Sequence, residues 1–240
     1  MYAIRNQKSG TPKKPIIKSS KCLGKLFAEP GDIITFGSYP YTNSQLKSSI
    51  KWLVLDKQDK KILIISKDAL DAKPYNKDNV DTTWKECTLR NWLNRDFYFS
   101  AFSADEKKSI VQTKVSAERN STYNTLLDNN ITDNVFLLSI NEVNKYFSTC
   151  IARQCAATDC AVAQGAHTSS EYTIGGRPSC WWWLRSPGGY ITYAPGARLG
   201  GSRSYTQCNA ANVEYNGSVG CRNVGSRGCV RPALWISLEA

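Results

Sequence analysis

The stretch Trp181-Trp-Trp-Leu-Arg-Ser-Pro187 decides our expectation of the fold, because it joins a buried segment to a long glycine-rich region. Four large apolar residues in a row, ended by Ser-Pro-Gly-Gly, are typical of a short strand that is buried on both faces. Arg185 follows this strand, and we expect it to bind loop carbonyls; the alternative role is that of an anion ligand. The stretch therefore predicts a buried strand that is followed by a glycine-rich region of turns and loops.

Residues 188–229 differ in composition from the rest of the chain. Eleven of the 16 glycines lie between Gly175 and Gly228, and 188–229 contains no Lys, Asp, Met or Trp. All 19 lysines lie at or before Lys145. Val213, Val219 and Val224 punctuate the segment, and with Val230 they read as scaffold positions, with Asn216-Gly217 as a hairpin turn.

Between Gly189 and Cys229 the side chains are mostly Tyr, Arg, Ser, Asn and Thr, interleaved with Gly and Ala. These residue types are enriched in protein-binding loops, because Tyr supplies contact area at low entropic cost, Arg makes forked contacts, and Ser and Asn adapt their hydrogen bonds. A long loop inside a compact domain is usually functional. We therefore predict a ligand-binding region over 188–229, with the site residues Tyr190, Thr192, Tyr193, Arg198, Ser202, Arg203, Tyr205, Asn209, Tyr215, Asn216, Arg222, Ser226 and Arg227.

Upstream of the tryptophans, short strands alternate with short helices. Two Ser-x-x-Glu capping boxes, at Ser103 and Ser139, predict the starts of two helices. The remaining pattern predicts strands at 32–36, 50–55, 61–66, 135–138, 181–184 and 230–236, and a helix around Leu89, Trp92 and Leu93. This order predicts an α+β single domain over 30–240 with a loop-rich C-terminal display region.

The net charge of +11 is concentrated at the N-terminus. Residues 1–28 carry seven basic residues and no acidic one, which leaves +4 for the other 212 residues. We expect 1–29 to form a basic, flexible arm; the alternative is that residues 1–28 contact nucleic acid or another polyanion. No apolar run is long enough for a membrane span or a secretory signal, which predicts no membrane association and favours a cytoplasmic or virion-associated location.

Residues typical of catalysis are scarce in this sequence. The one histidine, His167, lies in a stretch of small residues, and no phosphate-binding loop, dinucleotide fingerprint or zinc-protease motif is present. Nine cysteines form neither a paired disulfide framework nor a metal-binding spacing. We therefore expect no enzyme activity, no catalytic residue, no cofactor and no metal site.

Seven short blocks resemble, in order and spacing, a bacterial family of otherwise uncharacterised domains. That family is similar to the C-type-lectin-like fold, on the branch of formylglycine-generating enzymes and of the variable proteins of diversity-generating retroelements. The resemblance covers roughly 30–240 and implies that fold. The blocks are Phe36-Gly-Ser-Tyr-Pro40, Ile50-Lys-Trp52, Ala69-Leu70-Asp71, Leu89-Arg-Asn-Trp-Leu-Asn94, Val135-Phe-Leu-Leu-Ser139, Trp182-Trp-Leu-Arg-Ser-Pro187 and Arg231-Pro-Ala-Leu-Trp235.

The resemblance implies a bacterial or phage protein that is non-catalytic and variable and that displays a hypervariable surface to a protein or cell-surface ligand. Codons diversified by adenine-directed mutagenesis in such proteins exclude Lys, Gln, Glu, Met and Trp; 188–229 holds one Gln, Gln207, and one Glu, Glu214. Two alternatives stay open. One is a formylglycine-generating-type oxidase that uses Cys221 and Cys229, although the surrounding residues depart from that enzyme's pattern. The other is a basic nucleic-acid-binding accessory protein.

Overall fold

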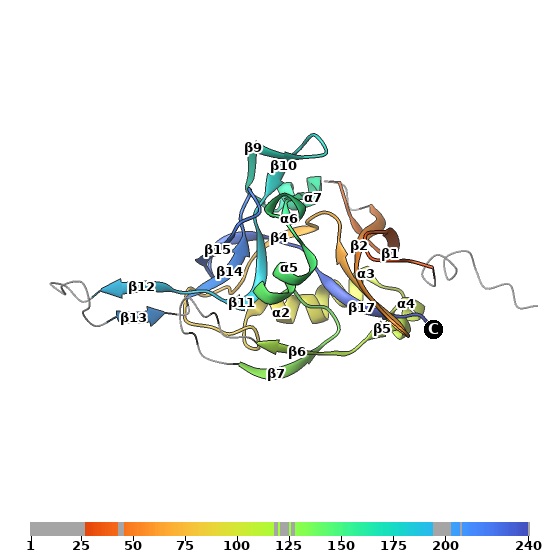
Figure 1. Cartoon of the computed structure of the whole chain (residues 1–240), viewed down its shortest axis with the longest axis horizontal. Helices are drawn as coiled ribbons and strands as arrows, with labels where there is room; N and C mark the ends of the chain where they lie inside the picture. The colour runs from red at the N-terminus through yellow and green to blue at the C-terminus, as the bar shows by residue number, and fades with distance from the viewer. Residues whose placement is uncertain are drawn as a thin grey trace, which may run out of the picture.

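The structure of the protein, a computed structural model, describes residues 27–42, 46–117, 120, 125, 128–193, 203–206 and 208–239. Its two largest sheets have five strands each (Figure 1). One cluster of buried side chains joins residues from both sheets and from the helices beside them.

The first sheet places the C-terminal strand beside strands from the first half of the chain. β3 is central, and its apolar run Ile62-Leu-Ile-Ile65 is buried, as is Ser66 after it. Leu234 of the last strand lies opposite Ile64 of β3. In sheet order the strands are β1 (Ile33–Pro40), β2 (Lys47–Gln58), β3 (Lys61–Ser66), β17 (Ala233–Ser237) and β5 (Ile110–Val111).

The second sheet is built around the tryptophan-rich strand. Trp182 lies opposite Val213 on one side and Cys229 on the other, and the pairing with Cys229 is parallel. The first half of the chain contributes one edge strand, in which Ala72 pairs with Cys229. In sheet order the strands are β15 (Val219–Asn223), β14 (Asn209–Val213), β11 (Trp182–Pro187), β16 (Arg227–Val230) and β4 (Asp71–Pro74).

Three smaller sheets surround this body. The hairpin of β12 (Tyr190–Tyr193) and β13 (Arg203–Thr206) extends away from the two large sheets (Figure 1). β6 (Thr113–Ala117) pairs with β7 (Asp128–Asp133). The third small sheet has the order β8 (Cys155–Ala156), β10 (Arg177–Cys180) and β9 (Thr168–Ile174), of which β9 and β10 form a second projecting hairpin in Figure 1.

The helices of the described residues are short. α2 (Thr88–Trp92), the π-helical turn η1 (Leu93–Phe97) and α3 (Tyr98–Ala101) follow one another directly. The others are α4 (Ala104–Ser109), α5 (Ile140–Tyr146), α6 (Cys150–Arg153) and α7 (Asp159–Ala163). Both predicted capping boxes are confirmed, because the serine hydroxyl and the glutamate carboxylate each accept the expected backbone N–H in α4 and in α5.

The α+β class predicted from the sequence is wrong. Strands account for 44% of the structure and helices for 20%, and apart from the parallel pairing of β11 with β16 the sheets are curled and antiparallel, which is not clearly the arrangement of an α+β C-type-lectin-like domain. The two predicted capping boxes give helices of only six and seven residues, α4 and α5, whereas the glycine- and valine-marked segment forms strand ladders. Val135–Leu138, predicted as a strand, makes only an isolated bridge from Phe136 to Ala233.

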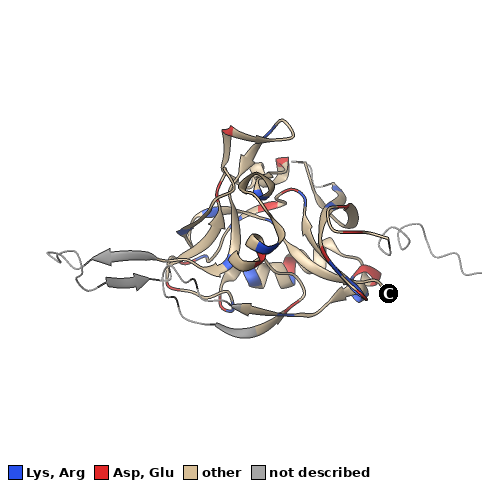
Figure 2. Cartoon of the chain, viewed as in Figure 1, with Lys and Arg blue, Asp and Glu red and all other residues tan. Residues whose placement is uncertain are grey.

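Charges are mixed over the described part of the chain. In Figure 2 basic and acidic residues both occur along the described part of the chain. Residues 1–26, which carry most of the basic arm, and Arg198 and Ser202 of the predicted site lie outside the described residues. Within the described ranges, no helix has both the length and the apolar character needed to cross a membrane.

Candidate functional site

The hairpin β14–β15 carries the best-described part of the region predicted to bind a ligand. Its strands pair from Asn209–Asn223 at one end to Val213–Val219 at the other. The turn holds Asn216-Gly217 as predicted, and the Gly217 N–H donates to the Glu214 carbonyl at 2.9 Å. β15 is an edge strand and half-buried throughout, whereas four of the five residues of β14 are buried.

The valines separate scaffold from surface in this region, as the sequence suggests. Val213, Val224 and Val230 are completely buried, and so are Trp182, Leu184 and Leu234. Val219 differs from the expectation, because it is half-buried on the edge strand. The scaffold under 209–230 is therefore continuous with the main core.

The predicted site residues differ in how far the structure exposes them. Asn216 and Arg227 are exposed, whereas Asn209, Tyr215, Arg222 and Ser226 are half-buried. The remaining described candidates lie on the paired strands of the β12–β13 hairpin, whose side chains are outside the described residues: Tyr190, Thr192, Tyr193, Arg203 and Tyr205.

Arg222 is the centre of a polar cluster on the face of the β14–β15 hairpin. Its guanidinium lies 4.7 Å from the centre of the Trp181 ring and 5.8 Å from that of Tyr215. Arg222 Nη2 donates to Glu214 Oε2 at 2.6 Å, and Asn212 Nδ2 donates to Glu214 Oε1 at 2.9 Å. The half-buried ion pair of Arg222 with Glu214 and the hydrogen bond from Asn212 hold these three side chains in one geometry.

Two buried polar atoms of the same cluster have no protein partner in the described part of the chain. They are Asn212 Oδ1, an acceptor, and Arg222 Nε, a donor. Gly220 keeps space open beside them, since a Cβ there would lie 2.9 Å from Glu214 Oε1 and 3.5 Å from Asn212 Oδ1. A water or ligand hydroxyl, which can both donate and accept, suits such a pair of atoms.

Sequence reasoning missed Asn212, Glu214 and Trp181 as members of this cluster. Glu214 is the only acidic residue within 188–229, and this isolation among arginines was the signal available in the sequence. Burial also raises the pKa of Tyr215, so its hydroxyl stays protonated. At neutral pH the surface offers a neutral phenol, a paired arginine and amide groups.

The candidates on β16 do not join this cluster. β14 and β11 lie between β15 and β16, so Arg222 and Arg227 lie on strands that are not neighbours in the sheet. Arg227 Nη1 donates to the Gln164 carbonyl at 2.9 Å, beside α7. The structure thus brings Tyr215 and Arg222 together, leaves Asn216 in the turn, where it accepts hydrogen bonds from Ser218, and places Arg227 in a separate group.

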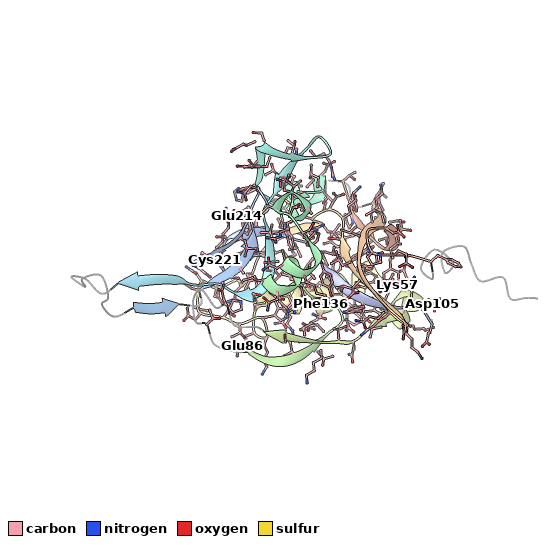
Figure 3. The ribbon with its side chains drawn as sticks, in the orientation of Figure 1. Lys57, Glu86, Asp105, Phe136, Glu214 and Cys221 are labelled. Atoms are coloured by element: carbon pink, nitrogen blue, oxygen red, sulfur yellow. The ribbon has the colours of Figure 1, made fainter. Side chains whose placement is uncertain are left out.

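The cysteine pair considered for an oxidase is not brought together. Cys221 lies on β15 and donates to the Gly189 carbonyl at 3.2 Å, whereas Cys229 is buried on β16, beyond β14 and β11. Figure 3 shows Cys221 and Glu214 on the β14–β15 hairpin. Cys229 instead contacts Cys180, which contacts Cys155, and burial raises the pKa of Cys155 well above its ordinary value. No three His, Cys, Asp or Glu side chains among the described residues form a group that could hold a metal ion.

Comparisons with known proteins identify a family and no individual relative. No curated protein and no solved structure matches the chain. The model of one family, described as a domain of unknown function (DUF6273), matches residues 59–238. The match takes in β3, both edges of the second sheet and the final strand, and it spans about three quarters of the 240 residues. The chain belongs to the DUF6273 family.

Proposed function

We propose that the protein is a non-catalytic ligand-binding protein whose residues 188–229, here called the display segment, form a variable surface for a protein or cell-surface ligand. The observation that carries the proposal is that residues 209–230 contain both completely buried scaffold residues and residues that reach the surface. Val213, Val224 and Val230 are completely buried, while Asn209, Tyr215, Asn216, Arg222, Ser226 and Arg227 reach the surface from the same strands and turns. Such a segment can change its surface without changing its core.

The composition of the display segment supports diversification by a retroelement. It lacks Lys, Met and Trp, which adenine-directed mutagenesis of the resembled variable proteins excludes. Glu214, the one Glu, is held by Asn212 and Arg222, so its position belongs to the structure under the surface and not to the exposed set. We therefore assign Glu214 to the invariant part of the display segment.

The proposal includes a bacterial or phage protein that acts in the cytoplasm or on a virion. The oxidase alternative is the weaker one, since Cys221 and Cys229 lie on strands separated by two others. The nucleic-acid alternative depends on residues 1–28, which carry seven of the net eleven positive charges. A polyanion contact through the arm remains compatible with ligand binding by the display segment.

Sequencing of the DNA that flanks the gene tests the proposal. The expected result is a near-copy of the codons for 188–236 beside a reverse-transcriptase gene, with mismatches only at adenines of the copy. Mismatches should fall at codons for surface residues such as Tyr215 and Asn216 and spare those for Val213 and Val224. Flanking DNA without such a copy, or mismatches spread over buried codons, would rule out the diversified display segment.

A further inference from the structure

Two buried cysteines lie directly opposite each other in the small sheet that carries the projecting β9–β10 hairpin. In the antiparallel pairing of β8 with β10, Cys155 is the partner of Cys180, and both are completely buried free thiols. Within the strand ladders of the described residues, no other cysteine has a cysteine as its partner. The strand register thus singles out one cysteine pair that the spacing along the sequence does not reveal.

The distance between directly opposite residues suits a disulfide bond. In an antiparallel pair the two Cα atoms lie about 4.5 or 5.5 Å apart, and their side chains leave the same face of the sheet. A disulfide spans Cα distances of about 4.4–6.8 Å. The thiols of Cys155 and Cys180 already hydrogen-bond each other, so the two sulfur atoms are in contact. The pair can therefore be bonded without a change of strand register.

The segment between the two cysteines is weakly anchored by its own side chains. The buried residues within 155–180 are all small, namely Cys155, Ala156, Thr158, Ala161, Ser179 and Cys180. The β9–β10 hairpin projects from the body in Figure 1, and nothing lies within 4 Å of a Cβ at Gly175 or Gly176 in its turn. Little apolar area thus holds this hairpin in place. A bond that closes the loop 155–180 would stabilise it by restricting the unfolded chain.

Cys229 is the competing partner for Cys180. Its thiol also contacts that of Cys180. However, Cys229 comes from β16 of the second large sheet, where its partners across the strands are Ala72 and Trp182. Only Cys155 has the directly opposite position, so the register favours Cys155 over Cys229 as the partner of Cys180.

A reagent in solution reaches this pair only while the sheet is open. Both thiols are completely buried, and burial holds the pKa of the Cys155 thiol well above its ordinary value. Because thiol–disulfide exchange needs an accessible thiolate, the folded pair reacts slowly. The exchange is therefore open to the chain while β8 and β10 are still apart, and the same burial then shields the bond from reductants.

We propose that Cys155 and Cys180 form a disulfide bond when the chain folds in the presence of a small disulfide such as glutathione disulfide. The thiolate of one cysteine attacks a sulfur atom of glutathione disulfide and displaces one glutathione. The other cysteine then attacks the protein sulfur of this mixed disulfide and displaces the second glutathione. Two electrons pass from the cysteine pair to glutathione disulfide, and the two thiol protons end on the two glutathiones released.

Refolding of the full chain in a glutathione buffer tests this cross-link. Neither cysteine belongs to the display segment, so the outcome is independent of the proposed function. The chain is unfolded under reducing conditions, refolded with reduced and oxidised glutathione, alkylated, and digested without reduction. We expect mass spectrometry of the digest to find a peptide pair that joins Cys155 to Cys180. Cys87→Ser, at another completely buried thiol, should leave this peptide pair unchanged.

Urea unfolding then measures what the bond does for the fold. The cross-linked parent should unfold at a urea concentration about 1 M higher than the reduced parent. This difference should persist in Cys87→Ser and vanish in Cys155→Ser. The peptide map of the parent decides the pairing even if Cys155→Ser does not fold. The proposal is overturned if no peptide pair joins Cys155 to Cys180, if Cys180 is joined mainly to Cys229, or if the oxidised and reduced parent unfold at the same urea concentration.

Discussion

At the scale of a single residue, burial changes the pKa of the Cys87 thiol. This thiol is completely buried, and it also caps α2 by accepting the Arg90 N–H. Burial raises the pKa of Cys87 to about 12 from an ordinary value of 9.0, because the thiolate cannot be hydrated there. The contribution of Cys87 to stability is therefore complete below pH 9 and is lost as the pH rises toward 12.

Cys87→Ser should flatten the pH dependence of stability on the alkaline side. The unfolded thiol ionises above about pH 9 while the folded thiol stays neutral, which lowers the free energy of unfolding by about 1.4 kcal/mol per pH unit. Serine does not titrate in this range and can still cap the helix. Urea unfolding at pH 8, 9, 10 and 11 should show this difference in slope between the parent and the variant; parallel curves would contradict it.

Two glycines with similar backbone angles have very different surroundings. Gly217 has φ +85° and Gly176 has φ +75°, so an alanine at either position meets the same strain. A Cβ at Gly217 would lie 1.7 Å from the carbonyl oxygen of Cys150, whereas nothing lies within 4 Å of a Cβ at Gly176.

Gly217→Ala should therefore destabilise the protein far more than Gly176→Ala. We expect about 1 kcal/mol for Gly176→Ala from backbone strain alone. For Gly217→Ala we expect about 3 kcal/mol or more, because the turn must also move away from α6. Chemical denaturation of both variants measures the difference, and equal losses would show that the turn does not contact α6.

At the scale of elements, the two capping boxes form a matched pair with different environments. Glu106 caps α4 and Glu142 caps α5 by the same two hydrogen bonds. Only Glu142 also carries a bidentate pair with Arg185, whose side chain is 3% exposed. Removing Glu142 leaves a buried guanidinium without its counter-charge.

Glu142→Ala should cost about 3–5 kcal/mol of stability. Glu106→Ala should cost less, about 1 kcal/mol for the cap and a little more for its hydrogen bond to the Gly37 N–H. Thermal or urea unfolding of the two variants tests the ranking. A loss from Glu142→Ala no larger than that from Glu106→Ala would mean that the ion pair with Arg185 contributes nothing to stability.

Local elements could be predicted from the sequence where their signals are local. The Ser-x-x-Glu patterns at Ser103 and Ser139 gave both helix starts, and the Asn216-Gly217 turn lies where expected. The class could not be predicted, because the number of strands depends on long-range pairing. Trp182 pairs with residues 31 and 47 positions later, and no local pattern identifies such partners.

The candidate site was predictable to the same extent. The valine spacing separated buried from surface positions in 209–230, with Val219 as the exception. The cluster of Trp181, Glu214 and Arg222 was not foreseen, since its members come from the residue after β14, from β15 and from the residue before β11. The separation of Arg222 from Arg227 likewise follows from sheet order, which sequence spacing does not reveal.

At the scale of the whole molecule, both halves of the chain contribute to each large sheet. β17 lies between β3 and β5, and β16 lies between β11 and β4. Neither sheet can keep its core if one half unfolds, so we expect one cooperative transition over the described body. Calorimetric unfolding with equal van't Hoff and calorimetric enthalpies is the expected result, and two separated transitions would contradict it.

The central claim is that the surface residues of the display segment tolerate substitution, whereas the buried residues of its scaffold do not. A saturation library over 209–230, sorted by resistance to proteolysis, tests it most directly. Most substitutions at Asn209, Tyr215, Asn216 and Ser226 should change stability by no more than about 0.5 kcal/mol. Polar substitutions at Val213, Val224 and Val230 should cost about 2 kcal/mol or more. If Tyr215 and Asn216 prove as intolerant as the valines, the segment is structural and the display account is wrong.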